Sequence, residues 1–365
     1  MQQQQHSINP APSVSSAFYA ELHCISNFSF LRGASRPEEL VEAAVEAGYS
    51  ALAITDECSM AGVVRGWTRA LELEKTHEEI YGAGTFDFQL IIGTEFLLDD
   101  GFRLVALASR FEGYRNLCKL ISDARRKAEK GSYVITREML EATDFAACCL
   151  ILAPPYFPAP GEQRYSLDPW FDWFAELASV TAARSAHVAL ELHYGQFDQQ
   201  HRNWLLRSCE ANENRTAIPL VACGDVHMHS RQRRALQDVV TCIRHNCTLD
   251  EAGRRLFPNG EHHLRNKFAL RATYPADLLQ ESLAIAACCS FRLGDLSYTY
   301  PREIVPDDQS PQDYLRQLTY DGLKWRWPQG ASNDVIDQIE HELALVREME
   351  YEPVSYTHLT LPTKA

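Results

Sequence analysis

Long apolar runs are missing from this chain of 365 residues, although 45% of its residues are hydrophobic. A helix that crosses a bilayer needs about 18 or more successive apolar residues, and the sequence has no such run. A basic start followed by an apolar core, the pattern of a secretory signal, is also missing at the N-terminus. We therefore expect no membrane span, and we predict that residues 1–17, rich in Gln, Ser and Pro, form a flexible tail.

An excess of positive charge is missing as well. The 35 Lys and Arg residues against 49 Asp and Glu residues give a net charge of −14. Binding nucleic acid through its phosphates needs a basic face, so this stretch by itself is not expected to form such a surface. An enzyme that acts on nucleic acid through a basic groove elsewhere is still compatible with this charge.

A CxxC motif is also absent, although the chain has 11 Cys. Their number is odd, and two pairs are adjacent in the sequence within apolar segments, namely Cys148–Cys149 and Cys288–Cys289. Reduced, buried thiols of a cytoplasmic protein are favoured over disulfides. The group Cys242, His245 and Cys247 has the residue types of a zinc knuckle, but it falls in a helical pattern without a second ligand pair.

Short apolar runs alternate with amphipathic segments along most of the chain. This alternation predicts an α/β fold with a parallel sheet, and the number of units favours a barrel over an open sheet. The predicted buried parallel strands are 51–54, 90–92, 104–108, 149–152, 188–192 and 220–223. The predicted helices between them include 36–44, ended by Gly48, then 114–130 and 231–244.

The pattern changes after about residue 275. Helices are predicted at 276–289, 313–325 and 334–350, with an extended segment at 298–306. We take residues 18–275 as one domain and 276–353 as a connector or the start of a second domain. Residues 354–365 depart from the helical pattern before them and are predicted to be a non-native tail, so we expect the natural protein to be longer.

Single polar residues follow several of the apolar runs, and these are the candidate metal ligands. A barrel supplies ligands in this way, one or two from each strand end. Carboxylates together with imidazoles suit Mn, Mg or Zn, and two or three such ions activate water against a phosphodiester. The alternative is that each is a structural polar residue at a strand end. The set is His23, Asp56, Glu95, Asp225 and His227.

Weaker candidates surround this set. His193, which follows Glu191 at another strand end, is a sixth possible ligand, and His227 forms an HxH with His229. The pair His262–His263 lies in a polar loop, where solvation is favoured. Two basic clusters, 125–127 and 231–234, are interpreted as solvated helix faces in preference to phosphate contacts. The aromatic cluster 170–174 is interpreted as helix packing in preference to a partner surface.

Five segments carry a resemblance to a known family: 19–35, 53–65, 112–122, 224–229 and 339–345. They resemble the N-terminal PHP (polymerase and histidinol phosphatase) domain of bacterial C-family DNA polymerases, closest to the error-prone branch. The resemblance implies a PHP-type distorted (β/α) barrel followed by the helical start of a polymerase palm or connector region.

Several positions depart from the pattern of a metal-competent PHP domain. Its His-x-His, Leu-Asp-Gly and Thr-Asp-His motifs have Ile25, Arg32 and Glu57 here, and a further His is replaced by Arg103. Ile has no ligand atom, and an Arg repels cations placed beside it. We therefore favour a structural salt-bridge cluster, in which Arg32 pairs with Glu95, Asp56 or Asp225, over a Zn or Mn site.

The resemblance implies an error-prone DNA-directed DNA polymerase active in damage-induced mutagenesis, translesion synthesis and repair. Its Mg ions bind palm aspartates beyond this region, so no catalytic residue is expected within this chain. The implied partners are DNA, through the polymerase core, the sliding clamp and accessory mutagenesis proteins. Two alternatives stay open. One is a metal-dependent PHP phosphoesterase or 3'-5' exonuclease using His23, Glu95, Asp225 and His227, and the other is a non-catalytic scaffold.

Overall fold

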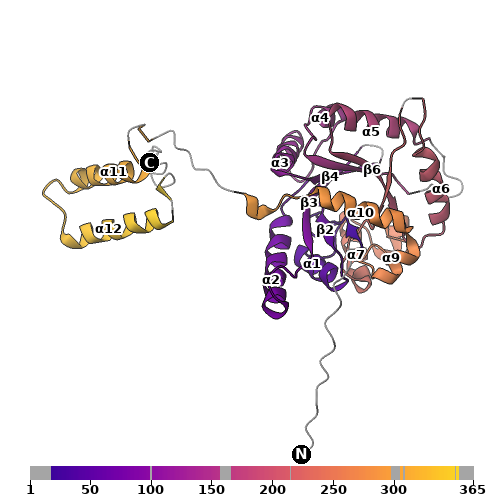
Figure 1. Ribbon diagram of the computed structural model, residues 1–365, viewed down its shortest axis with the longest axis horizontal. Coiled ribbons are helices and arrows are strands. Elements are labelled where there is room, and N and C mark those ends of the chain that lie inside the picture. Colours follow the sequence, from indigo (N-terminus) through magenta and orange to yellow (C-terminus); the bar gives the residue numbers. More distant parts are fainter. Residues whose placement is uncertain are drawn as a thin grey trace, which may run out of the picture. The chain divides into compact units, whose positions relative to one another are not determined.

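The structure is a computed structural model that describes residues 18–98, 101–156, 166–213, 215–296, 305–306, 309–349 and 351–352 (Figure 1). The chain divides into two compact units, one up to Leu296 and one from Ser297 onward. The predicted tails at 1–17 and 354–365, and most of the predicted extended segment at 298–306, lie outside the described residues.

Seven strands of the first unit form one sheet in sequence order, each paired with the next. They are β1 (Ala20–Glu21), β2 (Ala51–Ile54), β3 (Gln89–Leu97), β4 (Arg103–Ala108), β5 (Cys148–Ala153), β6 (Ser185–Glu191) and β7 (Leu220–Cys223). All six predicted strands are present. The prediction that all are parallel is wrong for β4, which runs antiparallel to both β3 and β5. The few residues between β3 and β4 suffice for a hairpin but not for a crossover helix, which a parallel pair requires.

The sheet closes on itself at one rim. Just beyond β1 and β7, Cys24 forms a parallel bridge with Val226. The amide of Ile25 donates to the carbonyl of Val226 at 2.9 Å, and the amide of Val226 donates to the carbonyl of His23 at 3.0 Å. The first and last strands therefore meet, and the predicted barrel is confirmed.

Helices surround this barrel and shield its outer face (Figure 1). They are α1 (Pro37–Glu46), α2 (Val63–Tyr81), α3 (Phe111–Arg126), α4 (Arg137–Glu141), α5 (Asp168–Val180), α6 (Asp198–Ser208), α7 (Arg234–His245), α8 (Leu249–Ala252), α9 (Lys267–Thr273) and α10 (Ala276–Cys288), with 3₁₀ turns η1 (Arg231–Arg233), η2 (Gly253–Arg255) and η3 (Leu293–Asp295). Helix α1 begins with Pro37 followed by two acids and stops before Gly48, whose φ is 74°, as the sequence predicts.

The barrel interior is filled by small and medium side chains that alternate along the strands, such as Ala51 and Ala53 of β2 and Val105 and Leu107 of β4. Helix α10 adds Ile285 and Ala286 to this interior cluster. The side chain of Ser282, also on α10, accepts a hydrogen bond from the amide of Ala20 at 3.0 Å. The first compact unit therefore extends past residue 275, the predicted end of the first domain.

The second unit contains two helices, α11 (Pro311–Arg326) and α12 (Asn333–Glu348), close to the predicted positions. Leu315 and Leu343 form its small buried core, and an ion pair joins Arg316 to Glu340 at 2.6 Å. That this unit begins a polymerase palm or connector region stays a prediction.

Candidate functional site

The alternation that fills the barrel interior continues to the rim and turns polar there. Counting in steps of two from the inward Ile91 of β3 and Val105 of β4 leads to Glu95 and Arg103. The same count from Ala189 of β6 and Cys223 of β7 leads to Glu191 and Asp225. Because β4 runs antiparallel, its first residue lies at the rim where the parallel strands end. Four charged side chains are thus directed toward one point.

His23 lies between two carboxylates at the centre of this rim. Its Nδ1 donates to Glu191 Oε1 at 2.6 Å, and its Nε2 donates to Glu95 Oε2 at 2.7 Å. Burial disfavours the charged ring, but the two carboxylates outweigh burial and raise the pKa of His23 to about 10. Both ring nitrogens therefore carry protons, and His23 is an imidazolium at neutral pH.

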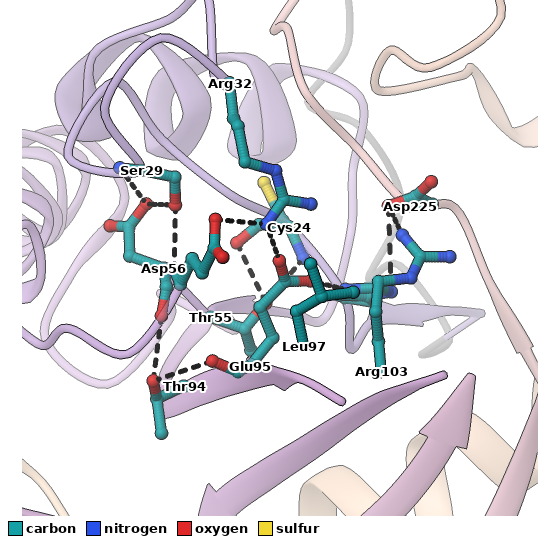
Figure 2. A network of polar contacts seen from close by, with 12 residues as sticks. Cys24, Ser29, Arg32, Thr55, Asp56, Thr94, Glu95, Leu97, Arg103 and Asp225 are labelled. Atoms are coloured by element: carbon teal, nitrogen blue, oxygen red, sulfur yellow. Dashed lines mark hydrogen bonds and ion pairs between the residues drawn. The ribbon is translucent and has the colours of Figure 1, made fainter. Parts of the chain in front are cut away.

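Arg32 reaches the rim from the loop after β1, and Figure 2 shows its guanidinium directed at Glu95. One nitrogen donates to Glu57 Oε2 at 2.6 Å and also to Glu95 Oε1. Tyr133 donates its hydroxyl proton to the other oxygen of Glu57 at 2.9 Å. Burial alone would raise the pKa of Glu95, but Arg32 and His23 hold it below its usual range. The predicted pairing of Arg32 with Glu95 is present.

Arg103 makes a second guanidinium bridge on the opposite side of His23. It donates to Asp225 Oδ1 at 2.6 Å, as Figure 2 shows, and to Glu191 Oε2 at 2.5 Å. Burial again opposes ionisation, yet Arg103 and His227 hold the pKa of Asp225 well below its usual range. Asp225 has a φ of 43°, a backbone conformation that costs free energy for a residue other than Gly. The Arg103 bridge contributes to holding this conformation.

The rim is therefore a nearly neutral ion cluster, which we call the rim cluster. Four carboxylates face three cations, two of them guanidinium groups and one an imidazolium. Its members are Glu57, Glu95, Glu191, Asp225, Arg32, Arg103 and His23. Below it Glu21, fully buried, accepts from the amides of His23 and Gly224. Burial raises the pKa of Glu21.

Asp56 lies apart from the rim cluster and does not pair with Arg32. Its Oδ1 accepts from the amide of Ser26 at 2.7 Å and from the hydroxyl of Ser29 at 2.7 Å, and its Oδ2 accepts from the hydroxyl of Ser26 at 2.7 Å. Asp56 thereby orders the loop that carries Arg32 (Figure 2). Ile25, beside this loop, is buried and apolar.

Four further histidines, among the candidates predicted from the sequence, contact backbone or side-chain atoms near the rim. His193 donates Nε2–H to the carbonyl of Gly224 at 2.8 Å, and His262 donates Nδ1–H to the carbonyl of Asp225 at 2.9 Å. His262 is buried, so the expectation that it is solvated is wrong, because its loop folds over the end of β7. His227 lies 3.2 Å from Asp225 Oδ1, and His229 lies 2.9 Å from the hydroxyl of Ser35.

The other sequence candidates are structural. The aromatic cluster on α5 is buried, as expected, and all 11 Cys are free thiols. Arg125 is not merely solvated, because it donates to the carbonyls of Glu57 and Cys58. In the basic cluster 231–234, Arg233 and Arg234 form ion pairs with Glu39 and Asp238. Among the described residues, Cys242, His245 and Cys247 do not gather into a metal-binding group.

Comparison with known proteins identifies the family to which this fold belongs. The family profile of the PHP domain matches residues 21–216, more than half of the chain. The chain belongs to the PHP domain family. Proteins named error-prone DNA polymerase match at 46% identity over 336 residues in Pseudomonas fluorescens (strain Pf0-1) and over 337 residues in Dechloromonas aromatica. Each match covers 92% of this chain and 30% of the relative, so the chain spans about a third of the length of these relatives.

Solved structures resemble this PHP domain only weakly. An amidohydrolase from Chromobacterium violaceum aligns with 57% of this chain and 88% of its own at 12% identity, with a TM-score of 0.37. Within the described parts of the chain, no helix is both long and apolar enough to span a membrane.

Two groups of buried residues in this PHP domain have ligand-type atoms within 4.8 Å of one another, namely His23 with Glu191 and Asp225, and His193 with Asp225 and His262. In the first group, both acids already accept hydrogen bonds from Arg103, and Glu191 also accepts one from His23, so the chain's own donors occupy the ligand atoms that a metal would need. In the second, the rings of His193 and His262 stack at 3.7 Å and 18°. A metal ion lies in the ring plane of each imidazole that binds it. Because the ring planes of His193 and His262 are nearly parallel, no nearby position lies in both, and one ion cannot bind both rings in this arrangement.

All members of the rim cluster except Glu191 are candidate or replaced site residues in the sequence, where Glu191 stands out only as the neighbour of His193. The inward alternation along β6 distinguishes the two, because it selects Glu191. Tyr133, which holds Glu57, carries no local signal at all, since its loop reaches the rim only through the tertiary fold.

Proposed function

We propose that this chain is the N-terminal part of an error-prone DNA polymerase of the bacterial C family. The proposal is supported by the 46% identity to proteins of that name, which extends over 92% of the chain and so beyond the PHP region. The longer protein would be a DNA-directed DNA polymerase of damage-induced mutagenesis and translesion synthesis, active in the bacterial cytoplasm. Its palm aspartates would hold Mg ions, its polymerase core would bind DNA, and the sliding clamp and accessory mutagenesis proteins would be its partners.

Within that enzyme, we propose that the PHP domain is an ion-paired scaffold without hydrolytic chemistry. The single observation that carries this role is the position of Arg32 and Arg103. Their guanidinium groups occupy the rim and bind the acids Glu95 and Asp225 that a metal would need. Positive charge is supplied by the chain itself, so the acids are compensated without an ion.

Metal analysis tests the scaffold role. After incubation with Mn²⁺ or Zn²⁺ and desalting, we expect far less than one bound ion per chain by elemental mass spectrometry. The matched positive control restores the family pattern by four substitutions, Ile25→His, Arg32→Asp, Glu57→His and Arg103→His, and we expect this variant to retain metal. One tightly held ion in the wild-type chain, lost in His23→Ala, would instead favour the metal-dependent phosphoesterase or exonuclease.

Primer extension tests the polymerase assignment separately. We expect the longer natural protein to extend a DNA primer in the presence of Mg²⁺, whereas the 365-residue chain alone does not. A longer protein that folds but extends no primer would contradict the polymerase assignment and leave the scaffold role untouched.

A further inference from the structure

A pocket of about 200 Å³ opens above the rim cluster, and four arginines contribute to its lining. Arg32 and Arg103 form its floor, and Arg244 and His245 of α7 and Arg255 of η2 form its wall. The lining contains a single carboxylate, that of Asp225, which Arg103 already binds. Because the acids of the rim cluster balance Arg32 and Arg103, the uncompensated positive charge of the lining is that of Arg244 and Arg255, in a chain whose net charge is −14.

The wall arginines are not used by the fold. Arg244 and Arg255 are exposed, and neither forms a hydrogen bond or an ion pair with another described residue. Arg244 and His245 lie in the last turn of α7, where cations offset the helix dipole, so this position alone would not indicate a ligand. Arg255 is on a different element, and the dipole of α7 does not explain its position in the wall.

A second, independent observation comes from Gln237 on the inner face of α7. The side chain of Gln237 lines the pocket, and the residue is 2% exposed. Its Nε2 donates to the carbonyl of Arg32 at 2.7 Å, which fixes the orientation of the amide. Its Oε1 is buried and has no hydrogen-bond partner among the described residues. A buried acceptor of this kind is satisfied only by a donor from a water or a ligand.

We propose that this pocket binds a small phosphate-bearing anion that also carries a hydroxyl group, such as inorganic phosphate or a nucleoside monophosphate. The phosphate oxygens accept hydrogen bonds from Arg244 and Arg255, for which the guanidinium geometry is suited. The hydroxyl, either P–OH or a sugar hydroxyl, donates to Gln237 Oε1. A carboxylate or a sulfate accepts from the arginines equally well but has no proton to donate to the amide oxygen at neutral pH.

The proposed anion binding does not depend on polymerase activity. It rests on the proposed scaffold role, in which Arg32 and Arg103 occupy the positions that the cations of a metal site would have. The ligand is held and not hydrolysed, since no group of the rim cluster is free to activate water. If the pocket does not bind phosphate, the proposed scaffold role is unaffected. If the wild-type chain retains metal, the scaffold role fails, but Arg244 and Arg255 still line the pocket and can be tested for anion binding.

Titration calorimetry of the 365-residue chain tests the proposal with three probes: inorganic phosphate, 2'-deoxyadenosine 5'-monophosphate and sulfate. We expect saturable binding of phosphate or the nucleotide and weaker binding of sulfate. Arg244→Gln and Arg255→Gln should each weaken phosphate binding by about tenfold, the usual effect of losing a charge-assisted contact. The matched control is Arg271→Gln, which removes an exposed arginine of α9 that does not line the pocket.

Gln237→Leu provides a readout that simple loss of charge would not change. In this variant the affinity for phosphate should fall to that for sulfate, while sulfate binding stays the same. Equal affinity for phosphate and the nucleotide would show that inorganic phosphate alone provides the contacts of the pocket. Tighter binding of the nucleotide would identify its sugar hydroxyl as the donor to Gln237 Oε1. Absence of saturable binding, equal binding of sulfate by the wild type, or an equal loss in Arg271→Gln would overturn the proposal.

Discussion

Replacement of Arg103 by Met measures the energy of the rim cluster. Arg103 is 15% exposed, and its partners Glu191 and Asp225 are each 8% exposed, at 2.5 and 2.6 Å. Met preserves much of the apolar stem, so the main change is the loss of the cation between two buried acids. Removing one partner of a buried ion pair costs about 3–5 kcal/mol, because the remaining charge is left uncompensated. We expect the free energy of unfolding to fall by that amount.

The matched control is Arg65→Met, the same substitution in an exposed pair. Arg65 lies 2.5 Å from Glu38, with exposures of 50% and 24%, so bond length is equal and burial differs. An exposed pair contributes about 1 kcal/mol or less after solvent screening. Urea denaturation followed by tryptophan fluorescence gives both values. If Arg103→Met costs no more than Arg65→Met, the rim cluster is not the compensated buried network that the structure describes.

The pH dependence separates lost charge compensation from lost packing. The pKa of Asp225 is held well below its usual range in the folded wild type, so its stabilising contribution is present above the unfolded value of about 3.9 and is lost as the pH falls through the folded value. In Arg103→Met the unpaired acids take up protons more readily. We therefore expect the difference between variant and wild type to be largest near neutral pH and to shrink in acid, whereas a packing defect would be independent of pH.

Two further predictions concern the residues around Arg103. The pKa of His23 is raised to about 10, so the stability that its charged ring contributes is complete below the unfolded value of about 6.5 and is lost as the pH rises through 10. The free energy of unfolding of His23→Gln should therefore depend less on pH between these limits, and the same pH dependence as in the wild type would contradict a protonated His23. Asp56→Ala removes the acceptor for the Ser26 and Ser29 amides and should cost about 2–4 kcal/mol; hydrogen exchange should accelerate at those amides, while uniform acceleration across the barrel would argue against a local role.

The strand positions were predictable because strands buried on both faces appear as uninterrupted apolar runs, such as Ala51–Ile54. The direction of β4 was not read from its own residues, since the run at 104–108 is equally apolar in either direction. The information lies in the short connection before it, which permits a hairpin and excludes a crossover helix. The direction matters for function, because it places Arg103 at the rim.

The candidate site was predictable in part for a similar reason. Residue type and strand-end position identify His23, Glu95 and Asp225, and the rim cluster contains all three. Asp56 has the same local signature, yet its oxygens face the amides and hydroxyls of Ser26 and Ser29. The sequence alone cannot distinguish these cases, because the direction of a side chain at the end of a strand depends on the loop that follows it.

The charge balance of the rim cluster has a consequence for any change back toward a metal site. Arg32→Asp alone places a new acid beside Glu57 and Glu95 and removes their cation, so we expect a loss of about 3–5 kcal/mol that Mn²⁺ does not reverse. The four-substitution variant also supplies imidazole ligands and removes the repulsion of Arg103, so an ion can replace both guanidinium groups. Its urea midpoint should rise with Mn²⁺ concentration, as expected when a ligand binds only the folded state. If Mn²⁺ stabilises the wild type equally, the guanidinium groups do not occupy the place of the ion.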